Sequence, residues 1–97
     1  PAPGGVTQPD MAHVHLPRSL VALLPGIPRR SDVPGDTVAD VLRALDDGWP
    51  GAWDRVCTSG PRIREHMNVY VDGVRAGLET PVGATSTVHV IPAVSGG

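Results

Sequence analysis

One amphipathic helix constrains the fold of this sequence more than any other feature. Thr37 and Asp40 stand three residues apart, as in the capping box that begins many helices. The residues that follow place apolar side chains at helical spacing on one side only: Val38, Val41, Leu42 and Leu45. Gly48 and Pro50 are typical of a helix end. A helix with a single apolar face must bury that face against another element, and we expect that element to be a sheet.

Short segments of strand character lie on both sides of this helix. Residues 13–16 alternate polar and apolar, and 29–33 is expected to pair with them as a hairpin. Residues 67–71 alternate again before Asp72-Gly73, a strong signal for a tight hairpin turn, after which 74–75 begins the return strand. Residues 88–91 form the last predicted strand. The order strand, strand, helix, strand, strand, strand predicts an α+β roll, with a mixed sheet of four to five strands packed on one main helix.

The remaining segments are predicted to be shorter or irregular. The apolar run 20–24 is expected to continue from the first strand as far as the Pro25-Gly26 turn, and 51–57 to form a short second helical turn. Residues 58–61 and 79–87 are predicted as loops. Residues 1–10, rich in proline and glycine, are expected to be a flexible N-terminal arm or a remnant of cloning. The folded domain is then 11–93, followed by a flexible tail, 94–97.

Composition excludes several classes of protein. With 97 residues, no Phe, two Trp and one Tyr, the chain can build one small core, mainly of aliphatic side chains. The net charge of −2 and the lack of a basic block argue against nucleic-acid binding, and no apolar run is long enough to span a membrane. The single Cys57 rules out an internal disulfide and favours a cytoplasmic protein, which we expect to be a monomer when alone.

No catalytic site is predicted. Serine, histidine and aspartate are present, but no nucleophile-elbow context brings them together. His13, His15 and His89 could share the outer face of the sheet, yet no cysteine pair or suitably spaced carboxylate joins them, so no metal site is predicted. Cys57 is expected to be a small buried hydrophobic residue rather than a nucleophile. The protein is therefore predicted not to be an enzyme on its own.

The glycine pair Gly96-Gly97 points to a different kind of chemistry. Glycine has no side chain, so a tail that closes with two glycines can enter a narrow slot on another protein. A carboxylate presented there is a weak electrophile, but an acyl-adenylate is activated, and a sulfur nucleophile can displace AMP from it. The product is a thiocarboxylate, a protein-bound sulfur donor.

Residues 68–73 (NVYVDG) and 90–97 (VIPAVSGG), set in this strand and helix order, resemble the MoaD/ThiS family of ubiquitin-like sulfur carriers. The resemblance covers about 11–97 and is closest to the actinobacterial branch that supplies sulfur for cysteine synthesis. It implies a β-grasp fold, no bound cofactor, and activation by an ATP-using, ubiquitin-activating-like adenylyltransferase and sulfurtransferase. It also implies a thiocarboxylate on Gly97, carried by the tail residues Val94, Ser95 and Gly96, and donation of its sulfur to a biosynthetic enzyme.

The predicted docking surface for the partner is the outer sheet face beside the tail. Tyr70, His89 and Ile91 should point away from the helix, because they alternate with valines that the core needs. Two alternatives stay open: a ubiquitin-like modifier that is conjugated to lysines, and a non-reactive β-grasp interaction module. The acceptor of the sulfur is also open and could be cysteine, a pterin dithiolene, a thiazole or a secondary metabolite.

Overall fold

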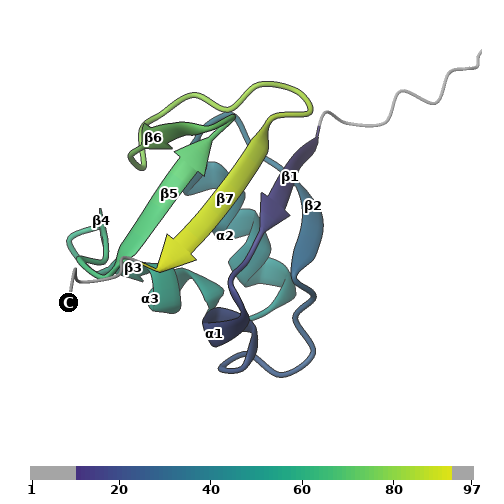
Figure 1. The fold of residues 1–97 in the computed structure, drawn as a ribbon, viewed down its shortest axis with the longest axis vertical. Coiled ribbons are helices and arrows are strands. Elements are labelled where there is room, and N and C mark those ends of the chain that lie inside the picture. Colours follow the sequence, from purple (N-terminus) through teal and green to yellow (C-terminus); the bar gives the residue numbers. More distant parts are fainter. Residues whose placement is uncertain (1–10, 93–97) are drawn as a thin grey trace, which may run out of the picture.

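The sheet of the computed structural model, which describes residues 11–92, is mixed and has the strand order β2-β1-β7-β5-β6. Its strands are β1 (Met11–His15), β2 (Arg30–Pro34), β5 (Met67–Val71), β6 (Val74–Ala76) and β7 (Thr87–Pro92). The last strand, β7, lies in the middle, parallel to β1 and antiparallel to β5 (Figure 1). This is the predicted α+β, β-grasp arrangement, and it places both ends of the described chain on neighbouring strands.

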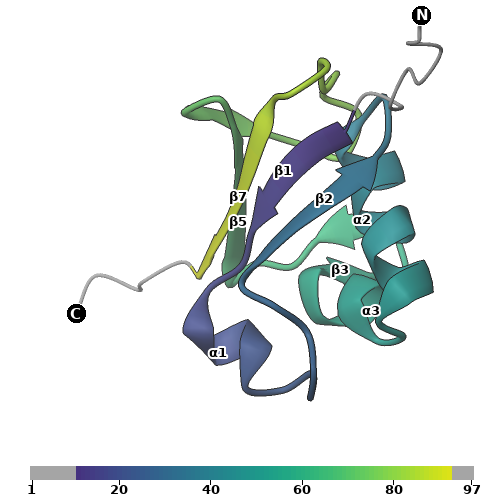
Figure 2. The same cartoon turned by 90° about the vertical axis from the view of Figure 1, so that its right-hand side faces the viewer.

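The helices leave one face of the sheet uncovered. The main helix α2 (Val38–Gly48) and the short helix α3 (Ala52–Val56) lie together on one side of the sheet, as Figure 2 shows. Helix α2 begins as predicted, because the side-chain oxygen of Thr37 accepts a hydrogen bond from the backbone N–H of Asp40 at 3.2 Å. The opposite side of the sheet carries no helix in the described part of the chain.

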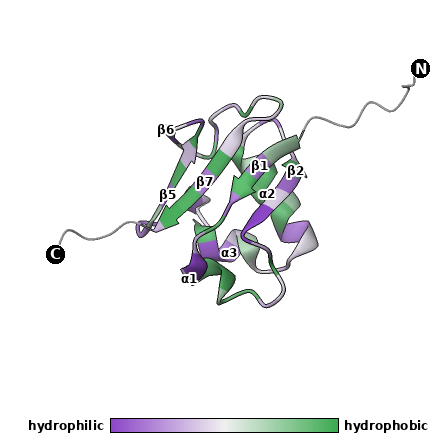
Figure 3. Ribbon diagram, turned by 45° about the vertical axis from the view of Figure 1, so that its right-hand side comes forward, coloured by the Kyte–Doolittle hydropathy of each residue, from purple (hydrophilic) through white to green (hydrophobic). Residues whose placement is uncertain are grey.

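The core lies between α2 and the sheet. The four residues of the predicted helix stripe are each at most 1% exposed: Val38, Val41, Leu42 and Leu45. The sheet contributes its inward-facing residues, among them Val14, Val69, Val88 and Val90. Figure 3 shows that much of the ribbon of β1, β5 and β7, at the centre of the sheet, has the green of hydrophobic residues. Val56 is fully buried and Trp53 is partly buried against the same core, as predicted for 51–57.

Two predicted segments differ from the structure. The run 20–24 does not extend the first strand; the chain forms helix α1 (Arg18–Val21), which buries Leu20 and leaves Leu23 52% exposed. Proline at 17 ends the strand and has the extended backbone of a helix N-cap. The predicted loop 58–61 is the turn of a small second sheet, in which β3 (Cys57–Thr58) pairs with β4 (Arg62–Ile63).

The domain division into 1–10, 11–93 and 94–97 stays a prediction, because residues 1–10 and 93–97 lie outside the described part. Within residues 11–92, none of the helices is both long and apolar enough to cross a membrane.

Candidate functional site

The three residues predicted to dock a partner share the uncovered face of the sheet. Tyr70 on β5 lies directly opposite His89 on β7, and Ile91 lies opposite Asn68 in the next outward position. The residues between them, Val69 and Val90, point into the core and are at most 2% exposed. Tyr70 and His89 are half-buried, and Ile91 is 43% exposed. The predicted strand register is therefore confirmed, whereas a docking role stays a prediction.

The end of β7 marks where the predicted tail begins. Pro92 pairs with Met67 at the start of β5. The residues after Pro92 therefore start from this end of the two central strands, not from an edge strand. A shallow hollow beside it is lined by residues of three segments: His15, Pro17, Arg29, His89, Ile91 and Pro92. The tail residues themselves, Val94, Ser95, Gly96 and Gly97, lie outside the described residues.

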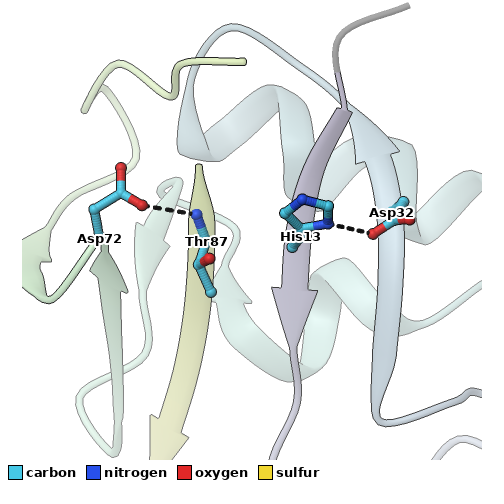
Figure 4. A network of polar contacts seen from close by, with 4 residues as sticks. All are labelled: His13, Asp32, Asp72 and Thr87. Carbon is cyan, nitrogen blue, oxygen red and sulfur yellow. Dashed lines mark hydrogen bonds and ion pairs between the residues drawn. The ribbon is translucent and has the colours of Figure 1, made fainter. Parts of the chain in front are cut away.

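The histidines of the uncovered face are only partly brought together. His15 and His89 face each other across β1 and β7, with ring centroids 4.5 Å apart in an edge-to-face arrangement. Burial lowers the pKa of His15, and the positive charges of His89, Arg30 and His13 lower it further. His13 instead pairs with Asp32 of β2, with Nδ1 2.6 Å from Oδ1 (Figure 4). No group of three or more metal-ligating side chains occurs within residues 11–92.

Asp72 has a structural role at the upper end of β7. It stands with Gly73 in the predicted hairpin turn, and both have positive φ angles, 49° and 86°. Its carboxylate accepts a hydrogen bond of 2.9 Å from the backbone N–H of Thr87 (Figure 4). Two hydrogen bonds lower the pKa of Asp72: this one has the larger effect, and one with the Ser86 side chain adds to it. The carboxylate thus fixes the start of β7 against the β5–β6 turn.

A second hollow lies on the helix side, between α2, the β3–β4 hairpin and residues 77–80. Its wall includes the ring of Trp53, over which the Arg43 guanidinium lies 4.9 Å from the centroid. The first N–H groups of α2 are not free to bind an anion there, because Val38 and Ala39 donate to the carbonyls of Thr80 and Leu78. The start of α2 therefore offers this hollow neither of these two backbone donors for an anion.

Cys57 behaves as predicted, as a small hydrophobic residue. Its side chain belongs to the core and is 1% exposed. Burial raises the pKa of its thiol to about 11, so the nucleophilic thiolate is scarce at neutral pH.

Sequence reasoning missed two charged residues of the uncovered face, Arg30 and Arg75. Arg75 lies opposite Tyr70, and Arg30 lies opposite His15. The first pairing could have been derived from the two-residue turn at Asp72-Gly73, which fixes the hairpin register. The second needed the exact pairing of β1 and β2, which a 14-residue connection between them does not determine.

Comparison with known proteins agrees with this architecture. The sequence profile of the ThiS family matches residues 23–97. The small archaeal modifier protein 1 of Haloferax volcanii is 38% identical over 69 residues, which cover 70% of this chain and 79% of that protein.

Solved structures are similar over most of their length. The chain matches one from the Amycolatopsis orientalis BexX/CysO complex with a TM-score of 0.79 and 26% identity, covering 89% of this chain and 99% of that one. It matches the Haloferax volcanii modifier with a TM-score of 0.71 and 32% identity, covering 90% and 99%. The profile match, the sequence relative and the shared β-grasp sheet lead to one conclusion: the chain belongs to the ThiS family, the ubiquitin-like family that its strand order and glycine pair resemble.

Proposed function

We propose that this protein is a sulfur carrier whose reactive group is the carboxylate of Gly97. In the first step a carboxylate oxygen attacks the α-phosphorus of ATP on a partner enzyme, which forms the acyl-adenylate and releases pyrophosphate. In the second step a hydrosulfide ion supplied by the partner attacks the acyl carbon, AMP leaves, the proton is lost to solvent, and a thiocarboxylate remains on Gly97. The carrier then gives this sulfur to a biosynthetic enzyme. It is a protein substrate of its partners rather than a catalyst.

The match to the ThiS family is the observation that carries the proposal, because it extends through Gly96 and Gly97 and thus includes the reactive residue itself. The position of β7 supports it. This strand is the central one of the sheet, and its pairing with β5 continues to Pro92, so the residues after Pro92 start from a strand that is paired to its last residue. A rigid base of this kind favours accurate presentation of a tail to an active site.

The partner is an adenylyltransferase and sulfurtransferase of the ubiquitin-activating type, which uses ATP and, we propose, acts in the cytoplasm. We infer that it binds the uncovered face around Tyr70, His89 and Ile91, next to the start of the tail. The similarity to a chain of the BexX/CysO complex supports complex formation with a partner protein, without identifying the activating enzyme. Transient interfaces commonly have an apolar core and a polar rim. The exposed Ile91 beside the half-buried Tyr70 and His89 fits that arrangement.

The test is ATP–pyrophosphate exchange catalysed by the cognate adenylyltransferase. Deletion of Gly97 should abolish exchange, because the carboxylate then stands one residue short of the ATP. Gly77→Ala is the matched control, because a methyl group at this exposed glycine meets no atom within 4 Å. The control should support full exchange. Full exchange by the Gly97 deletion would contradict the proposal.

A second function is favoured by one observation, the 38% identity to a small archaeal modifier protein. In that case the activated Gly97 would be joined to lysines of other proteins. The two functions differ in their product: the modifier gives isopeptide-linked conjugates in a cell lysate, whereas the sulfur carrier gives a thiocarboxylate on the free chain.

A further inference from the structure

A row of side chains crosses the uncovered face from one edge of the sheet to the other. The strand pairings join five residues in sequence: Arg30, His15, His89, Tyr70 and Arg75. Paired residues of neighbouring strands project on the same face, so all five belong to one surface, called here the cross-strand row. Four steps of about 4.8 Å between strands make it about 19 Å long. None of the five is buried, and both arginines are exposed.

The cross-strand row contains only groups that can donate hydrogen bonds or carry positive charge. Its two arginines are permanently charged, and protonation of the two histidines would raise the charge of the row from two to four. The half-buried Tyr70 adds a phenol at the centre. Two carboxylates stand two positions from members of the row, and both accept hydrogen bonds: Asp32 from His13 and Asp72 from the backbone N–H of Thr87. The row itself contains no carboxylate that could neutralise its positive charge.

The charged groups that shift the pKa of His15 are all basic. Arg30 faces His15 from β2, His13 lies two residues away on β1, and Arg29 lines the same hollow as both rings. On the other side, His89 faces Tyr70, and Arg75 follows on β6. These positive neighbours favour the neutral form of the His15 imidazole in the free protein. An anion laid on the row would remove the repulsion and favour protonation.

We propose that the cross-strand row binds an acidic segment of a partner protein, through aspartate or glutamate carboxylates, and that binding takes up a proton at His15. An extended segment of about six residues matches the length of the row and presents alternate side chains to it. Ile91, in the position next to His89 on the same face, would add an apolar contact at the end nearest the tail. This inference rests on the proposed function only for the identity of the partner, since the row itself does not involve Gly97.

The probe is an acetylated and amidated hexaglutamate peptide, titrated into the isotope-labelled protein and followed by NMR at about pH 7.5 and about pH 5.5, where glutamate stays ionised. We expect amide shifts at the five residues of the row, and a dissociation constant roughly five-fold or more lower at the acidic pH. Hexaglutamine and inorganic phosphate serve as comparison ligands. Equal binding of hexaglutamine, equal binding of phosphate, or shifts confined to other faces would overturn the proposal.

Two pairs of variants separate charge from protonation. H15Q/H89Q should abolish the difference between the two pH values, and R30Q/R75Q should weaken binding at both. R18Q/R55Q, at exposed positions of α1 and α3, is the matched control for the arginine pair. His66→Gln, at an exposed position in the loop before β5, is the control for the histidine pair. The backbone spectrum of each variant reports whether it is folded. An unchanged pH dependence in a folded H15Q/H89Q, or equal weakening by the control arginines, would refute the assignment.

The peptide titration and the pyrophosphate exchange fail independently. Exchange that requires Gly97, without any binding of hexaglutamate, would leave the sulfur-carrier proposal standing and remove the acidic partner segment. Binding of hexaglutamate without exchange would support the acidic partner segment and remove the sulfur-carrier proposal.

Discussion

Ile91 is the residue on which the docking surface can be tested most sharply. Its side chain is 43% exposed, on the face opposite the helix and next to the end of β7. If it is a central contact of the partner, Ile91→Asp should weaken binding to the adenylyltransferase by about 2–4 kcal/mol, because a charge would replace a desolvated apolar group. The thermal midpoint of the isolated protein should change little, since the residue is not part of the core.

Val74→Asp is the matched control for this substitution, because Val74 is also a strand residue and is 69% exposed, but lies on the edge strand β6. It should leave affinity nearly unchanged. Unfolding of Ile91→Asp would show that Ile91 supports the core. Normal folding with normal affinity would show that the partner reads another surface.

At the level of elements, the entry into α2 contains Gly35, which has the least room for a side chain of all glycines in the described part of the chain. A methyl group added to Gly35 would lie 2.7 Å from the backbone nitrogen of Val41 and 2.7 Å from its Cγ2. Neither the backbone of α2 nor the fully buried Val41 has room to move. Gly35→Ala should therefore lower the free energy of unfolding by about 1–3 kcal/mol, as measured by urea denaturation.

Gly48→Ala provides the comparison at the other end of the same helix. A methyl group there meets no atom within 4 Å. Alanine also has the higher helix propensity, worth up to about 1 kcal/mol in a helix interior. This variant should be as stable as the parent protein or more so. Equal loss of stability in both variants would show that close packing at Gly35 is not the cause.

The elements with a clear period could be predicted from the sequence, and the others could not. The stripe of α2 and the alternation of β1, β5 and β7 give each residue a definite side, so their buried and exposed faces are confirmed. Helix α1 is four residues long, and β3 and β4 have two each, too short for any period to emerge. The run 20–24 is predicted to continue the first strand and 58–61 to be a loop, whereas the chain forms a helical turn at Arg18–Val21 and a hairpin around 58–61.

The candidate site was predictable only in part for a related reason. The direction of Tyr70, His89 and Ile91 followed from local alternation. The cross-strand row depends on which strands are neighbours, and the parallel contact of β1 with β7 joins residues more than 70 positions apart. The sequence pattern predicts that His13, His15 and His89 could share the outer face, but only His15 and His89 face each other; His13 lies opposite Thr87, and its ring is bonded to Asp32.

At the scale of the whole molecule, the absence of lysine affects what an activated carrier can do. All eight basic residues are arginines, whose guanidinium groups stay protonated and are poor nucleophiles. The chain therefore offers no side-chain amine to an acyl-adenylate on another copy. Incubation with the adenylyltransferase and ATP should give no oligomers linked through side chains, as judged by denaturing electrophoresis and mass spectrometry.

A variant with one surface lysine supplies the control for this prediction. Arg55→Lys keeps the charge at an exposed position of α3 and introduces a single amine. Linked dimers should be able to form only through this lysine. Side-chain-linked oligomers of the parent chain would contradict the account.

The central claim is that sulfur is carried on Gly97, and the mass of the protein tests it most directly. The chain is produced together with its activating enzyme and a sulfur source, and its intact mass is measured before fragmentation. We predict a fraction of chains in which sulfur has replaced one oxygen, with the change located at Gly97. The buried thiol of Cys57, with its raised pKa, should stay unmodified. Added sulfur located at Cys57, with an unchanged Gly97, would indicate a persulfide carrier and contradict the mechanism proposed here.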